Sequence, residues 1–121
     1  MNKQMTQIEQ LTELVLKFRH ERDWEQFHNP KDLAISLVLE SSEVLEHFQW
    51  KTSEEINDHI KQHKEDIGDE IADVLSWILL IAHDLDIDLK KAYVSKLEKN
   101  NAKYPVALAK GNHKKYTEHI S

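Results

Sequence analysis

Two pairs of carboxylates lie beside the two most apolar stretches of this 121-residue chain, and the members of each pair are three residues apart. A carboxylate among buried apolar side chains is costly unless a cation compensates it. On a helix, residues three apart lie on one face, so two facing helices would bring all four carboxylates together. The pairs are Glu40/Glu43, after the apolar residues 33–39, and Glu70/Asp73, before the apolar residues 74–82.

Four converging oxygen donors of this kind describe a site for Mg²⁺ or Mn²⁺, since these hard cations prefer oxygen ligands. The same residues are also compatible with ordinary solvent-exposed acids, because helices are rich in glutamate. Three further acids nearby allow other pairings, namely Glu46, Asp66 and Asp69. The spacing alone therefore leaves both interpretations open.

The rest of the chain is typical of an all-α protein. It contains only two glycines and two prolines, and residues that favour helices are abundant. The clearest helix start is Asn29 as N-cap, followed by Pro30 at the first helical position. Residues 52–64 open with a capping-box pattern and form either a separate short helix or the beginning of the next one. We predict a four-helix bundle with its main helices at about 4–22, 30 to 48 or 50, 65–84 and 88–104.

The length fits one domain over residues 1–121, with a polar and basic tail from about 106 to 121. A chain this short buries only about two-thirds of its unfolded surface, so we expect it to oligomerise. It has no cysteine, which excludes a thiolate zinc site and a cysteine nucleophile. We expect a cytoplasmic protein without a membrane partner, because the sequence shows no signal peptide and no uncharged apolar run of about 18 residues.

The formal net charge of −6 is unevenly distributed along the chain. Residues 1–39 have a net charge of −1, residues 40–88 of −11 and residues 89–121 of +6. An acidic middle followed by a basic end fits a site that holds a metal and then a polyanion. On charge alone, however, a solvated acidic face with a basic tail is the favoured interpretation. The acidic middle argues against nucleic acid as a partner, because it would repel the phosphate backbone.

Basic and amide side chains recur on one face of the last predicted helix, at Lys96, Asn100 and Lys103. The spacing of four and then three residues places them on one stripe. Such a stripe can hold the β- and γ-phosphate oxygens of a nucleoside triphosphate. The alternative is a lysine-rich face that is simply solvated.

Three tryptophans lie near the ends of the predicted elements around the acids. Trp24 is in the loop before the second helix, Trp50 ends that helix, and Trp77 lies one turn past Asp73. Indole rings in these places can stack on a nucleobase. The alternative is that they close the ends of the core.

The histidines give weaker signals. His59 and His63 have the four-residue spacing that can bind zinc on a helix, but no third ligand is evident, so we interpret them as surface residues. Glu25 and His28 form a Glu-x-x-His pattern of the kind used by di-iron bundles. That pattern precedes the helix that starts at Asn29, so a di-iron site is a weak alternative.

With these residues, the chain resembles the all-α nucleoside triphosphate pyrophosphohydrolases of the MazG-like family, and more narrowly their dCTP pyrophosphatase branch. The metal site of the family has the pattern Glu40-x-x-Glu43 followed by Glu70-x-x-Asp73. The narrower resemblance spans roughly residues 11 to 117. Its segments are Glu21-Arg22-Asp23-Trp24-Glu25-Gln26-Phe27-His28, Phe48-Gln49-Trp50-Lys51, and Ser95-Lys96 through Asn100 to Tyr104-Pro105.

The resemblance implies Mg²⁺-dependent hydrolysis of a (deoxy)nucleoside triphosphate to its monophosphate and pyrophosphate, with Mn²⁺ as a second option. The implied substrate is dCTP or a modified dCTP, and the implied role is sanitation of the nucleotide pool. The family assembles as dimers or dimers of dimers. Val15 stands where the vertebrate-type enzyme has a histidine near the base, so the base preference stays open.

By position, the resemblance assigns the acids to metal binding and catalysis, the basic stripe to phosphate and sugar, and the tryptophans to the base pocket. Trp77 stands where this branch often has a tyrosine near the sugar. The residues are Glu40, Glu43, Glu70 and Asp73; Lys96, Asn100 and Lys103; and Trp24, Trp50 and Trp77.

A function of another class also fits the sequence. In a non-catalytic helical interaction module, the acids would be solvated and the tryptophans would form a partner interface. Such a module would bind no nucleotide, and its thermal stability would not respond to Mg²⁺.

Overall fold

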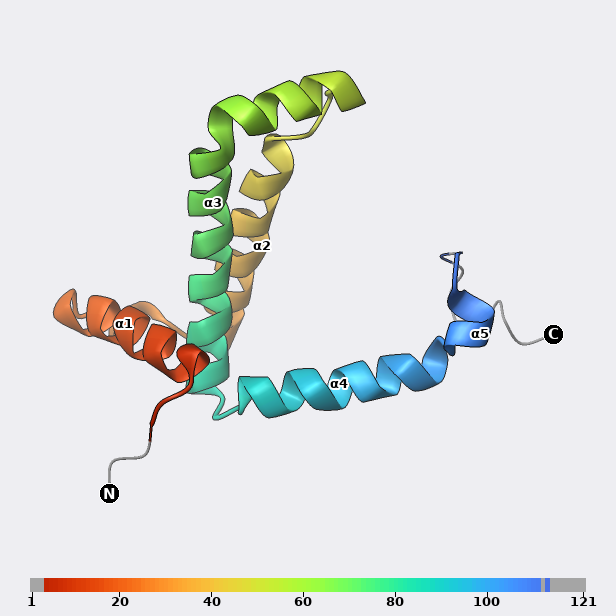
Figure 1. The fold of residues 1–121 in the computed structure, drawn as a ribbon. Coiled ribbons are helices and arrows are strands. Elements are labelled where there is room, and N and C mark those ends of the chain that lie inside the picture. The colour runs from red at the N-terminus through yellow and green to blue at the C-terminus, as the bar shows by residue number, and fades with distance from the viewer. Residues whose placement is uncertain (1–3, 112, 114–121) are drawn as a thin grey trace. The chain divides into compact units, whose positions relative to one another are not determined.

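The computed structural model describes residues 4–111 and 113 of the chain, and it is built from helices (Figure 1). No strand occurs among the described residues, so the all-α prediction is confirmed. The elements are α1 (Gln7–Glu21), the 3₁₀ helix η1 (Glu25–Phe27), α2 (Pro30–Glu46), α3 (Ser53–Asp84), α4 (Leu89–Lys103) and α5 (Val106–Ala109).

Each of the four long helices begins at a residue whose side-chain oxygen accepts a hydrogen bond from a backbone N–H three residues later. The caps are Thr6, Asn29, Thr52 and Asp88. Side-chain caps of this kind satisfy a backbone donor that the first turn leaves free. The predicted starts at Asn29 and Asp88 are confirmed, and the Thr6 cap explains why α1 begins three residues later than predicted.

The segment between the two acid pairs differs from the prediction in two ways. First, α2 ends at Glu46 and the chain turns through the next four residues, with Trp50 in the left-handed region at φ 65°. Second, the predicted boundary before residue 65 is a kink within α3, which runs on from the Thr52 cap, so the two alternatives left open for residues 52–64 are combined in one element. It bends at His63, whose backbone angles (φ −125°, ψ 24°) are not helical. We call this bend the elbow of α3; it is visible in the green part of the ribbon (Figure 1).

Two other helices also end in a left-handed residue that is not glycine. Asp23 follows α1 and Asp86 follows α3, each with φ 54°. In both cases two backbone N–H groups turn back onto the last carbonyls of the helix, as in a Schellman motif. Glycine usually occupies this position because it has no Cβ.

The described residues divide into two compact units, with the boundary between Ile87 and Asp88. In the first unit, α3 packs against both α1 and α2, and α2 runs beside α3 below the elbow (Figure 1). Only five apolar side chains are buried among the described residues: Leu33, Ile67, Leu79, Leu80 and Ala82. The second unit contains α4 and α5; the predicted basic tail begins in α5, and residues 112 and 114–121 lie outside the described part.

Among the described helices, none is long and apolar enough to cross a membrane.

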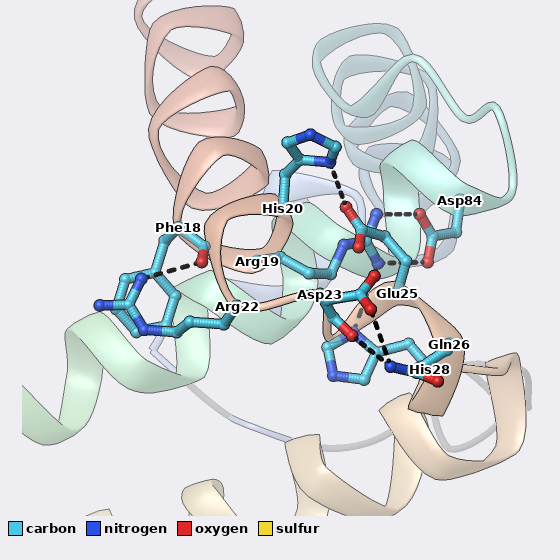
Figure 2. A network of polar contacts seen from close by, with 9 residues as sticks. All are labelled: Phe18, Arg19, His20, Arg22, Asp23, Glu25, Gln26, His28 and Asp84. Carbon is cyan, nitrogen blue, oxygen red and sulfur yellow. Dashed lines mark hydrogen bonds and ion pairs between the residues drawn. The ribbon is translucent and has the colours of Figure 1, made fainter.

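An ion pair joins the end of α1 to the end of α3. Arg19 is buried, and its two terminal nitrogens each donate a 2.8 Å hydrogen bond to one carboxylate oxygen of Asp84 (Figure 2). These bonds from Arg19 lower the pKa of Asp84. Arg19 also lies 3.4 Å from Nδ1 of His28, in the loop between α1 and α2. The pair therefore fixes this aromatic loop as well as the two helices.

Asp84→Asn should lower the free energy of unfolding by about 3 kcal/mol, because it leaves the buried guanidinium of Arg19 without its counter-charge. Urea unfolding followed by circular dichroism measures this change. Because the pKa of Asp84 is lowered in the folded state, the stabilisation is complete above the ordinary aspartate pKa of about 3.9. This stabilisation is lost as the pH falls through the lowered pKa of Asp84.

The matched control is Asp86→Asn, because Asp86 is exposed and asparagine tolerates its left-handed backbone. We expect this control to change stability by less than about 0.5 kcal/mol. If Asp84→Asn cost less than about 1 kcal/mol, the pair would behave like a surface salt bridge and the anchoring role would be wrong.

Candidate active site

Three glutamates from two helices converge in the first unit. Glu40 and Glu43 of α2 and Glu70 of α3 each place a carboxylate oxygen within 4.8 Å of the others. They meet because both acid pairs lie on the faces along which α2 and α3 pack. The structure thus brings together three of the four acids predicted for the site, and we call them the glutamate cluster.

The fourth predicted acid, Asp73, lies beside the cluster rather than within it. It follows Glu70 by one turn of α3 and is exposed. Its negative charge raises the pKa values of both Glu40 and Glu70, so it belongs to the same electrostatic site.

The crowded carboxylates change one another's protonation. The pKa of Glu70 is raised to about 7. The main cause is the hydrogen bond with the carboxyl of Glu43, and burial and the charges of the surrounding acids raise this pKa further. Burial is the main cause that raises the pKa of Glu40, and Glu43 adds to it. A hydrogen bond with Trp77 has the opposite effect, because it lowers the pKa of Glu40.

The donor set fits a divalent cation. Among the described side chains, Oε2 of Glu40 and Oε2 of Glu70 are buried oxygens without a hydrogen-bond partner. Buried carboxylate oxygens normally have such a partner or bind a metal. Clustered carboxylates suit hard cations that prefer oxygen, such as Mg²⁺ and Mn²⁺.

A cavity of about 490 Å³ opens next to the acids. Glu40 and Asp73 line it, and so do the aromatic side chains of Trp24 and Trp77. His28 also lines the cavity and contacts Trp77 edge to face, with ring centroids 5.5 Å apart. The remaining lining is mainly apolar and comes from α1 and α3: Leu11, Leu14, Val15, Phe18, Ala72, Leu75, Leu79 and Leu80. Two flat aromatic side chains and an apolar wall beside the acids suit a planar ligand with a charged group.

The other predicted site residues are Trp50 and three residues of the second unit. Trp50 follows α2 and is 92% exposed, and it is not among the side chains that line the cavity. Lys96, Asn100 and Lys103 lie on one helix, α4, which belongs to the second unit. Their role in phosphate binding, like that of Trp50 in base binding, stays a prediction.

Two residues at the cavity were not assigned to the site from the sequence. His28 appeared in a di-iron pattern and as the last residue of a segment that carries the resemblance, but without a role at the site, and Arg19 was not singled out. The apolar stripe of α1 was a usable signal, because the spacing of Leu11, Val15 and Phe18 places them on one helix face, and such a face usually packs in the core. Instead they line the cavity, and Leu11 and Phe18 are more than 40% exposed. The partner of Arg19 lies 65 residues away, and nothing in the local sequence indicates it.

Comparison with known proteins identifies the family. The MazG-like family matches residues 35–118, which is more than half of the chain. The chain belongs to the MazG-like family.

Similar proteins include two mammalian relatives and one archaeal structure. The chain is 40% identical to dCTP pyrophosphatase 1 of Rattus norvegicus and 38% identical to that of Homo sapiens, in each case over 113 residues. These matches cover 92% of this chain and 66% of each relative, so this MazG-like chain spans about two-thirds of their length. The crystal structure of a pyrophosphatase from Archaeoglobus fulgidus superposes with a TM-score of 0.79 at 36% identity. That match covers 87% of this chain and 98% of the archaeal one.

The raised pKa of Glu70 should make the metal-free protein less stable as the pH rises from about 4.5 to about 7. Over this range the folded state retains a proton that the unfolded state has lost, so rising pH favours unfolding. Glu70→Gln removes the titrating group and should flatten this dependence. Thermal unfolding in EDTA at a series of pH values measures it.

Glu65→Gln serves as the control, because Glu65 is exposed on the same helix and lies outside the cluster. It should keep the wild-type dependence on pH. Identical pH profiles for wild type and Glu70→Gln would show that the carboxylates do not share a proton.

Proposed function

We propose that this chain is a Mg²⁺-dependent nucleoside triphosphate pyrophosphohydrolase, acting as one MazG-like domain. The reaction would consume one water and release a nucleoside monophosphate and pyrophosphate. The observation on which this depends is the glutamate cluster beside a cavity lined by Trp24 and Trp77. A metal-binding group and a base-sized aromatic pocket are the two parts that such a reaction requires.

The metal would be held by Glu40, Glu43, Glu70 and Asp73. The two buried glutamate oxygens without a partner support this assignment, as does the convergence of three carboxylates. When bound, Mg²⁺ or Mn²⁺ supplies positive charge that activates water and stabilises the phosphates. Glu43 is the exposed member of the cluster, and we assign to it the acceptance of the proton from the attacking water.

The cavity would bind the nucleoside. Trp24 and Trp77 offer ring faces and edges to the base, and the apolar side chains of α1 would exclude water from it. The names of the mammalian relatives support dCTP or a modified dCTP as substrate. Lys96, Asn100 and Lys103 would bind the phosphates and sugar, and Trp50 would complete the base pocket.

Glu43→Gln and Asp73→Asn should each abolish turnover, because each removes a charge that the metal and the water require. The assay incubates the protein with each ordinary dNTP and NTP and with 5-substituted dCTP, in Mg²⁺ or in EDTA. Anion-exchange chromatography separates the products. Monophosphate with pyrophosphate, formed only with metal, is the expected result for the wild type.

Glu46→Gln is the matched control, since Glu46 is exposed on α2 one turn after Glu43 and lies outside the glutamate cluster. It should retain activity close to that of the wild type. Full activity in both Glu43→Gln and Asp73→Asn would refute the site. No turnover of any nucleotide by the wild type would favour the non-catalytic interaction module.

We also propose that the chain assembles with copies of itself as a dimer or a dimer of dimers. Its small core supports this, because five buried apolar side chains are few for a chain of this length. Apolar side chains instead occupy an exposed stripe on α2: Ile35, Val38, Leu39 and Leu45, which are 46–67% exposed. A continuous apolar stripe of this kind marks an interaction surface.

Leu39→Glu should dissociate the assembly, because it places a charge in the middle of this stripe. Size-exclusion chromatography with light scattering should give two or four times the chain mass of 14.3 kDa for the wild type. Gln62→Glu, which adds a charge at an exposed position on α3, should not change the mass. A wild type that elutes as a monomer at micromolar concentration would contradict the proposal.

A further inference from the structure

Three histidines meet at the elbow of α3, where His47 follows Glu43 of the glutamate cluster by four residues, about one helical turn. His47 follows α2, and His59 and His63 lie on the first part of α3. Nδ1 of His47 is 2.8 Å from Nε2 of His59. The rings of His59 and His63 are stacked, with centroids 4.5 Å apart and planes inclined by 27°. Packing of the chain thus supplies the third histidine that the spacing of His59 and His63 lacks in the sequence.

We infer that His47, His59 and His63 form a second metal site, for a transition-metal ion such as Zn²⁺ that prefers imidazole ligands. This site differs from the glutamate cluster in ligand chemistry, because its donors are nitrogens and no cysteine or glutamate takes part. The inference does not depend on the proposed hydrolase activity.

The first two ligands are nearly in place. A hydrogen bond between two imidazoles needs one ring nitrogen without a proton, so at least one lone pair points into the gap between His47 and His59. Zinc–nitrogen bonds of about 2.0–2.1 Å at a tetrahedral angle hold two ligand nitrogens about 3.3 Å apart. The rings therefore have to separate by about half an ångström from their 2.8 Å contact to admit the ion.

His63 provides the third ligand after a rotation of its side chain. Among the described residues, only the glutamate cluster already has three ligand atoms within 4.8 Å of one another. The side chain of His63 is 44% exposed, which leaves it room to turn. Its Nδ1 lies 3.2 Å from a carboxylate oxygen of Asp66, which leaves Nε2 for the ion. A carboxylate on the far nitrogen of a metal-binding histidine fixes the tautomer and strengthens the ligand.

The position of the site suggests what the ion would do. His47 belongs to the turn after α2, whereas His59 and His63 lie on α3, with His63 at the bend itself. An ion bound to all three would tie the end of α2 to the first part of α3. Because His63 is the residue with non-helical backbone angles, the ion would also fix the angle of the elbow.

The test is calorimetric titration of Zn²⁺ into metal-free protein in the presence of Mg²⁺, which occupies the glutamate cluster. We expect one Zn²⁺ per chain. His47→Gln and His59→Gln should each lower the affinity at least about tenfold, and Asp66→Asn should lower it by about tenfold. Circular dichroism shows whether each variant remains folded.

Two controls separate this site from other zinc binding. Glu43→Gln should bind Zn²⁺ as the wild type does, and so should His83→Gln, which removes an exposed histidine elsewhere on α3. Absence of Zn²⁺ binding by the wild type would overturn the inference. Unchanged affinity in the folded His47 and His59 variants, or loss of binding in Glu43→Gln alone, would also overturn it.

Discussion

Packing of α2 along α3 holds Glu40, Glu43 and Glu70 closer together than their charges favour. The backbones of the two helices fix where the carboxylates lie, so the carboxylates cannot move apart when they ionise. The protein alone meets this constraint by keeping a proton on Glu70 up to about pH 7. A divalent cation meets the same constraint without the proton. Protonation and metal binding are therefore alternative ways to stabilise one arrangement of side chains.

The ion pair between Arg19 and Asp84 holds together the two helices that line most of the cavity, α1 and α3. It connects the last turn of α1 to the last turn of α3, and Trp24 and His28 lie in the loop that follows α1. The acids are thus held together by the packing of α2 on α3, whereas the loop with Trp24 and His28 is held by the contact between α1 and α3. This division explains how a chain with a small core can build both parts of the site.

The sequence was informative where structure depends on neighbours along the chain. The caps Asn29 and Asp88 could be predicted because capping involves residues only three apart. The convergence of the acid pairs followed from helical periodicity. Long-range pairs could not be predicted, because their partners lie far apart in the chain: 65 residues for Arg19 and Asp84, and 12 for His47 and His59. The elbow lies at the predicted boundary between residues 52–64 and the helix at 65–84, but no glycine or proline at His63 indicates that the chain bends there. The placement of Trp50 and of the α4 residues at the site remains a prediction.

The helix ends at Asp23 and Asp86 have a consequence for the stiffness of the turns. An ordinary residue in the left-handed region costs about 1–2 kcal/mol relative to a right-handed one. A glycine there would avoid this cost, but it would also give the unfolded chain more freedom, which costs about 0.4–1 kcal/mol. The second effect offsets about half of the first, so a chain with only two glycines can end its helices in this way at a moderate net cost. The benefit is a short, stiff connection after α1, next to Trp24, which lines the cavity.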